Sequence, residues 1–67
     1  MEMIPVSSRA IRAVGYDKLT QRLRITFEQG DSYDFCRVPV HIYEGLMRAS
    51  SKGSFYNDHI RDRYQCF

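Results

Sequence analysis

Residues 50–64 hold the side chains best suited to chemistry, because they combine cations, tyrosines, hydroxyls and amides at high density. Lysine and arginine contact phosphate groups, and tyrosine rings stack on the exposed bases of single-stranded RNA. This composition favours a nucleic-acid-binding surface near the C-terminus. The candidate residues are Lys52, Tyr56, Asn57, Arg61, Arg63 and Tyr64.

A second interpretation of the same residues is structural. A chain of 67 residues needs its aromatic side chains for burial, so Tyr56 and Tyr64 would complete a small core. The arginines of this stretch would then pair with Asp58 and Asp62 at the surface, where ion pairs contribute little. Both interpretations are compatible with the sequence.

The cysteines and histidines are the residue types that bind zinc, but Cys36-x4-His41 and His59-x6-Cys66 do not have the spacings of a zinc finger. A Cys36–His41 nucleophilic pair has no third group to orient the histidine. Two cysteines are too few for the disulfide framework of a secreted domain, so we expect free thiols. We also expect no metal, no cofactor, no small-molecule substrate and no catalytic activity.

The length and the charge of the chain restrict its possible functions further. Sixty-seven residues make one domain of marginal stability, and no apolar run approaches the roughly 20 residues that span a bilayer. We therefore expect a cytoplasmic protein without a membrane partner. The net charge of +2 lies after residue 36, because the five cations and five anions before residue 37 cancel. A mild excess of this kind is compatible with nucleic acid without being diagnostic.

The elements that must position these residues begin with strands. Residues 11–16 and 22–27 are predicted as strands, the second because its apolar and polar residues alternate strictly. Ile11 breaks the parity of the first strand, so a bulge is expected near Arg12. Gly15 inside that strand suggests the close approach of another segment.

A three-residue loop at residues 28–30, with Gly30 in a left-handed conformation, sets the register of the next hairpin. A two-residue turn would put the aromatic residues of the third strand on its polar side. The longer loop instead gives sensible cross-strand pairs. The predicted pairs are Ile25 with Tyr33, Leu23 with Phe35, and Arg24 with Asp34.

Helices follow the third strand. Pro39 suits the first turn of a helix whose apolar face recurs every three to four residues as far as Ser50. Gly53 is predicted as its C-terminal cap, and a short helix capped by Ser54 or Asn57 follows. The predicted fold is α+β: a three-stranded antiparallel meander packed by one long helix, then a short C-terminal helix. Residues 1–6 are predicted as a flexible arm and residues 7–67 as a single domain.

An ordered set of motifs extends over nearly the whole chain. Its members are Ser7-Ser8, Ile11, Gly15-Tyr16-Asp17, Phe27, Gly30, Tyr33-Asp34-Phe35, Val38-Pro39, Tyr43, Leu46, Ala49-Ser50-Ser51-Lys52-Gly53, Phe55-Tyr56-Asn57 and Ile60-Arg61-Asp62-Arg63-Tyr64. This set resembles the KTSC domain family, which is named after the C-terminal extension of some lysyl-tRNA synthetases and also occurs as small standalone bacterial and phage proteins. The sequence departs from the family pattern at Phe35, where a second tyrosine is usual, and at Asp62, where glycine is common.

The resemblance implies a small binding domain, for which RNA binding has been suggested from the synthetase context. We take RNA or tRNA binding as the leading hypothesis. The alternative is a protein-interaction module, either an adaptor or a homodimer, with no nucleic-acid role. Salt separates the two, because phosphate binding weakens steeply as salt rises and an apolar interface does not.

Overall fold

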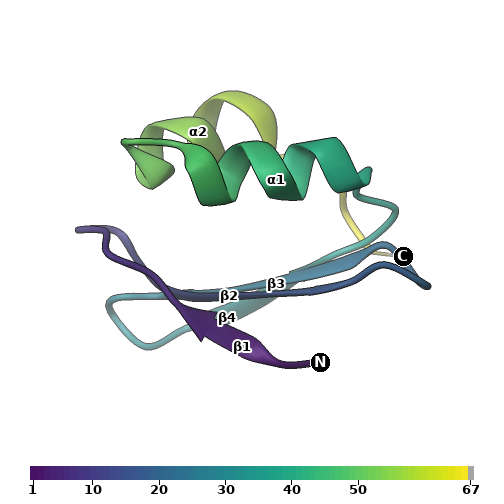
Figure 1. Ribbon diagram of the computed structural model, residues 1–67, viewed down its shortest axis with the longest axis horizontal. Helices are drawn as coiled ribbons and strands as arrows, with labels where there is room; N and C mark the ends of the chain where they lie inside the picture. The colour runs from purple at the N-terminus through teal and green to yellow at the C-terminus, as the bar shows by residue number, and fades with distance from the viewer. Residues whose placement is uncertain (67) are drawn as a thin grey trace.

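Both helices lie on the same face of an antiparallel sheet whose strand order is β1-β2-β3-β4 (Figure 1). The computed structural model describes residues 1–66. This architecture confirms the predicted α+β class, with a meander covered by helices on one side. The elements are β1 (Met3–Pro5), β2 (Ile11–Asp17), β3 (Arg22–Phe27), β4 (Ser32–Phe35), α1 (Val40–Arg48) and α2 (Lys52–His59).

The predicted hairpin register is confirmed in all three pairs, since Leu23 faces Phe35, Arg24 faces Asp34 and Ile25 faces Tyr33. Gly30 has a φ of 109°, so the loop uses the left-handed conformation that glycine allows. A loop of three residues, and not two, therefore determines which side chains of β4 face the helices.

The N-terminal segment is a strand where the sequence predicted a loose arm. Met3 pairs with Gly15 and Pro5 pairs with Ala13, which adds β1 to the edge of the sheet. An edge strand tolerates proline because one side of its backbone has no partner. A Cβ on Gly15 would lie 2.6 Å from the Met3 sulfur, so the predicted close approach at this glycine is confirmed.

The bulge in β2 is also confirmed, because the register with β3 shifts between Ile11 and Ala13. The Ser8 hydroxyl accepts hydrogen bonds from the main-chain N–H groups of Ala10 and Ile11, at 3.1 and 3.2 Å. This turn leads the chain from β1 into the bulged start of β2.

The boundary between the helices differs from the prediction. Helix α1 ends at Arg48, and Ala49 leaves it in an extended conformation, so no left-handed glycine is needed to stop it. Gly53 instead belongs to the first turn of α2, which Ser51 caps by accepting the Ser54 N–H. A Cβ on Gly53 would lie 3.2 Å from the Ala10 side chain. Helix α2 has eight residues and α1 has nine, so the two are nearly equal in length.

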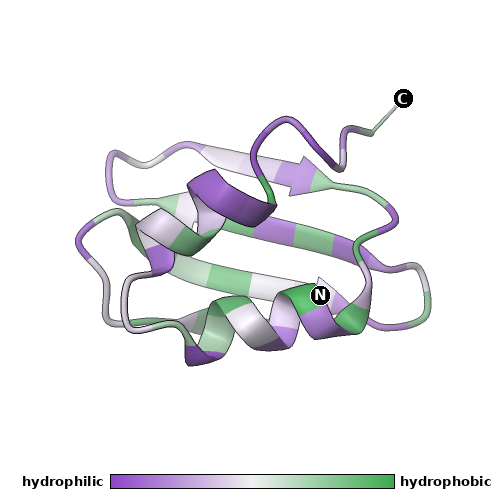
Figure 2. Cartoon of the chain, turned by 90° about the horizontal axis from the view of Figure 1, so that it is seen from above, coloured by the Kyte–Doolittle hydropathy of each residue, from purple (hydrophilic) through white to green (hydrophobic). Residues whose placement is uncertain are grey.

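The core lies between the sheet and the two helices, where apolar residues alternate with polar ones along the strands (Figure 2). Leu46 is its fully buried contribution from α1, and Ile60 closes it just after α2. Gly45 lets the helices approach, since a Cβ there would lie 2.7 Å from the Phe55 ring. The fully buried side chains are Ile11, Val14, Leu23, Ile25, Val38, Leu46 and Ile60.

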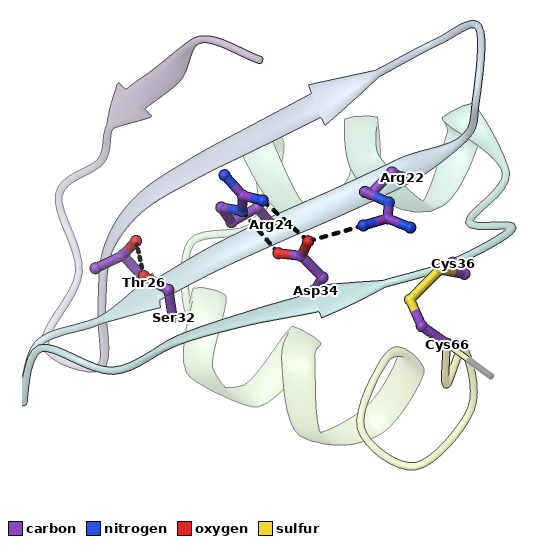
Figure 3. A network of polar contacts seen from close by, with 7 residues as sticks. All are labelled: Arg22, Arg24, Thr26, Ser32, Asp34, Cys36 and Cys66. Carbon is purple, nitrogen blue, oxygen red and sulfur yellow. Dashed lines mark hydrogen bonds and ion pairs between the residues drawn. A yellow bond between two sulfur atoms is a disulfide. The ribbon is translucent and has the colours of Figure 1, made fainter.

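Cys36 and Cys66 form a disulfide, so the expectation of free thiols was wrong (Figure 3). The bond joins the end of β4 to the segment that follows α2. Two cysteines are too few for a secreted disulfide framework, but one bond needs only two that lie close together in the fold. Here the chain between them folds back over the sheet, so cysteines 30 residues apart meet.

Candidate nucleic-acid interface

The six candidate residues do not form one cluster. Lys52 begins α2, whereas Arg61 and Arg63 follow its C-terminal end. Eight helical residues are about 12 Å long at 1.5 Å per residue, so Lys52 lies at the opposite end of the helix. Its ammonium donates to the Ala49 carbonyl at 2.9 Å, where its positive charge stabilises the C-terminus of α1.

The burial of Tyr56 and Tyr64 agrees in part with each of the two interpretations of the sequence. Tyr56 is half-buried, and its ring makes edge-to-face contacts with Phe27 and Phe35 at centroid distances of 5.1 and 5.9 Å. Burial raises the pKa of its phenol. Tyr64 is also half-buried and packs against the core, whereas Asn57 is exposed. The tyrosines therefore have structural roles and retain only part of their surface for a ligand.

Residues 60–66 form an irregular segment held beside β4. The Cys36 N–H donates to the Tyr64 carbonyl at 2.8 Å, and the Arg63 N–H donates to the Ile60 carbonyl at 3.1 Å. Asp62 has a φ of 63°, in the region that favours glycine. Together with the disulfide, these bonds fix where the arginines of the segment emerge.

The arginines of this segment are exposed and weakly paired. The guanidinium of Arg61 lies 4.0 Å from the Asp62 carboxylate, with both side chains mostly exposed. The predicted pairing with Asp58 is absent from the ion pairs of the described residues 1–66, and so is any ion pair of Arg63. Exposed pairs contribute little, so both cations remain available to an anionic ligand.

Two hollows flank the segment. The first, of about 400 Å³, we call the arginine hollow; it lies among Cys36, Arg37, Asp62, Arg63, Tyr64 and Gln65. The second, of about 270 Å³, we call the edge hollow; it lies among Tyr33, Asp34, Phe35, Tyr56, Asp62 and Gln65, beside the Cys66 end of the disulfide.

Arg37, Tyr33 and Gln65 are among the residues of these hollows that the sequence did not identify as candidates. Arg37 stands directly after Cys36 with a φ of 56°, which turns the chain out of the sheet. Tyr33 was correctly placed on the helix-facing side, but β4 is an edge strand and the ring is 51% exposed. Only a predicted Cys36–Cys66 bond would have brought Gln65 to this place.

A third hollow, of about 550 Å³, lies where residues 7–10 meet residues 50–53. Three of its polar side chains already have partners within the protein. Ser51 caps α2, Ser8 stabilises the turn before β2, and Lys52 bonds to the end of α1. These three side chains therefore stabilise local structure within each segment and are already hydrogen-bonded within the protein.

The sheet face opposite the helices carries an ion-pair network (Figure 3). Asp34 accepts two hydrogen bonds from Arg24, at 2.7 and 3.0 Å, and one from Arg22 at 3.2 Å. The Arg24 guanidinium, with a smaller contribution from Arg22, holds the pKa of the Asp34 carboxyl below its usual value. The predicted Arg24–Asp34 pair is confirmed, and the network occupies cations that would otherwise be available to a ligand.

Neither a metal site nor a membrane span is found in the described part of the chain. No three histidine, cysteine or acidic side chains of residues 1–66 are grouped to hold an ion. None of its helices is long and apolar enough to cross a bilayer.

Comparison with known proteins decides the family, since the KTSC domain model matches residues 7–64. The chain belongs to the KTSC domain family. A crystal structure of a KTSC domain protein from Yersinia pestis superposes with a TM-score of 0.90 at 37% identity, covering 98% of this chain and 93% of that one. A protein from Tsukamurella paurometabola is 38% identical over 94% of both chains.

The KTSC relationship extends to larger proteins. Lysine–tRNA ligases of Nostoc punctiforme and of a Nostoc species are 34% and 33% identical to this chain over 82% of its length. The matched part is 10% of each ligase and lies in its C-terminal region. The chain therefore corresponds to a small appended region of those enzymes.

The structure explains both departures from the KTSC pattern. Phe35 is only 8% exposed, so a phenylalanine ring fills this place without a hydroxyl that needs a partner. Asp62 has a positive φ, which accounts for the glycine that is common there. Aspartate is among the residues that tolerate this conformation.

Proposed function

We propose that this KTSC domain is a non-enzymatic module that binds RNA or tRNA through its C-terminal segment. The observation that carries the proposal is the convergence of Arg37 and Arg63 on one hollow, with Arg61 exposed on the adjoining turn. Asp62 is the one acidic residue that lines this hollow. Arginine is well suited to phosphate, because its planar group donates in a fixed fork.

The relatives support the same proposal. A region related to this chain is part of lysine–tRNA ligases, whose name gives tRNA as their substrate. A domain that accompanies such an enzyme and also exists at about its own size, as in Tsukamurella paurometabola, suits a general affinity for RNA. Fold and relationship alone do not define a function, and the arginines are the chemical groups that would bind RNA here.

The proposal keeps part of the surface predicted from the sequence and changes the rest. Arg61, Arg63 and Asn57 stay as contacts with the ligand, and Arg37 joins them. Lys52 is left out because it lies at the other end of α2 and bonds to Ala49. Tyr56 and Tyr64 contribute the edges that they expose.

The test compares two double variants by fluorescence anisotropy with labelled single-stranded RNA and with tRNA, over a range of salt concentrations. Arg61→Gln/Arg63→Gln removes two cations from the segment. Arg9→Gln/Arg48→Gln removes two exposed cations near the N-terminal end of α2, the end opposite to the segment, and serves as the control. The first variant should bind more weakly, and its slope of log affinity against log salt should become shallower by about 1.4, at about 0.7 per contact. The control should match the parent.

Equal losses in both variants would show that net charge, and not this surface, attracts RNA. If the parent binds no RNA even at low salt, where attraction is strongest, the RNA proposal is rejected. A protein-interaction module, as an adaptor or a homodimer, would then replace it.

A further inference from the structure

The edge hollow differs from the arginine hollow in the chemistry of the residues that line it. Its lining combines three aromatic side chains, Tyr33, Phe35 and Tyr56, with the polar residues Asp62 and Gln65. No cation lines it. A phosphate group does not suit such a place, whereas a flat ring with polar edges does.

Ring surface is available in the edge hollow. Tyr33 touches Phe27 edge to face, at a centroid distance of 5.7 Å and an interplanar angle of 67°, and it is half exposed. Between β2 and α1, by contrast, Tyr16 and Tyr43 stack on each other at 4.7 Å and 7°, so each covers a face of its neighbour. Tyr33 has no stacked partner among the aromatic pairs of the described residues.

The open edge of β4 adds hydrogen-bonding groups to the hollow. Phe27 donates to the Asp31 carbonyl, which makes the first hydrogen-bonded pair of this ladder. Hydrogen-bonded and non-hydrogen-bonded pairs alternate along antiparallel strands. The pair of Arg24 with Asp34 is therefore of the non-hydrogen-bonded kind, and the main-chain N–H and C=O of Asp34 point away from β3. The Cys36 N–H has the same parity, and it donates outward to the Tyr64 carbonyl. Asp34 therefore presents one donor and one acceptor at the hollow.

An extended peptide that pairs with β4 as an additional strand would be the other natural ligand for an open sheet edge. Here the C-terminal segment of the chain limits how far such a peptide can pair. The Tyr64 carbonyl already occupies the N–H of Cys36, so an extended peptide has only Ser32 and Asp34 to pair with. The hollow, at about 270 Å³, is also slightly below the size of most ligand pockets. Both facts favour a small planar group over a strand.

We infer that the edge hollow is a nucleobase-binding subsite, in which a base stacks on Tyr33 and its polar edge meets Asp34, Asp62 and Gln65. The inference rests on the proposed function. The two hollows share Asp62 and Gln65, so a nucleotide with its base in one places a neighbouring phosphate near Arg63 in the other. Recognition of single-stranded RNA has this form, with bases on aromatic rings and phosphates on arginine.

The test separates stacking from the remaining interactions of the ring. Tyr33→Leu keeps an apolar side chain and loses the aromatic face, and Tyr33→Phe keeps the face and loses the hydroxyl. Affinity is measured with single-stranded RNA hexanucleotides of each base, and with a hexanucleotide that lacks its central bases. Circular dichroism checks that both variants fold, as expected for a half-exposed residue.

Tyr33→Leu should lose about 5- to 150-fold in affinity for hexanucleotides, the size of one base–aromatic stack, and Tyr33→Phe should bind like the parent. The base-free oligonucleotide should bind the parent and Tyr33→Leu equally. If the leucine and phenylalanine variants bind alike while Arg61→Gln/Arg63→Gln still weakens binding, the subsite is wrong and the proposed function stands. If the parent binds no RNA, both the nucleobase subsite and the proposed function are rejected.

Discussion

Replacing Cys36 and Cys66 by serine should destabilise this domain by about 3.5 kcal/mol. The disulfide closes a loop of 30 residues. In the loop-entropy description, the unfolded chain then loses about 12 cal/mol/K, which is about 3.6 kcal/mol at 25 °C. Domains typically have about 0.05–0.15 kcal/mol of stability per residue, or about 3–10 kcal/mol for 67 residues. The bond would therefore provide a large share of the total.

Other contacts of the C-terminal segment should change this value little. The hydrogen bond from the Cys36 N–H to the Tyr64 carbonyl involves only main chain, and Ile60 is buried whether or not the sulfurs are joined. Both survive the substitution, so they cancel between the parent and the variant. A loss of 3.5 kcal/mol corresponds to a fall in Tm of about 15–30 °C in a domain of this size.

The assay is thermal and guanidinium unfolding followed by circular dichroism, with and without a phosphine reductant. The oxidised parent should unfold at the highest temperature and at the highest guanidinium concentration. The reduced parent should unfold like Cys36→Ser/Cys66→Ser. The double variant should not respond to the reductant, which controls for other effects of the reagent. A double variant that unfolds within about 0.5 kcal/mol of the oxidised parent would refute the loop-entropy reasoning, as the expected effect is several times larger.

Two further predictions concern the core and the open face of the sheet. Leu46→Ala should cost about 2–5 kcal/mol, because the side chain is fully buried between α1 and the sheet; a variant that melts like the parent would contradict this packing. Asp34→Asn should cost about 0.2–1 kcal/mol at neutral pH, since the pair with Arg24 is partly exposed. The folded pKa of Asp34 is lowered, so its contribution is present above the unfolded pKa of about 3.9 and is lost as pH falls through the folded value. Unfolding curves of parent and variant should therefore converge in strong acid, and a constant difference down to pH 2 would argue against the ion pair.

The sequence by itself determined the meander and its register. Strict alternation in β3 sets which side chains face the helices, and the parity of the hairpin then requires a three-residue loop. These signals are local, because they depend on neighbours in the chain and on the two-residue period of a strand. The buried positions of Leu46 and Ile60 follow from the same kind of pattern.

The helix boundary at residues 49–53 shows where local signals mislead. Gly53 has the character of a helix cap, yet the structure uses it to bring α2 close to Ala10, forty-three positions earlier in the chain. A glycine reports only that space or backbone freedom is needed, and propensity does not say which. The approaching segment is known only after the chain has folded.

Only the tertiary structure decided the composition of the candidate site. Pairing of Cys36 with Cys66 places residues 60–66 against β4, so that Gln65 lines one hollow with Tyr33 and Arg63 lines the other with Arg37. These contacts join residues about thirty positions apart, and no periodicity of the sequence specifies them. Density of suitable residues suggested one continuous surface at residues 52–64, but the length of α2 separates its two ends. The chemistry of a site depends on which side chains converge in space, and the sequence specifies that convergence only through the whole fold.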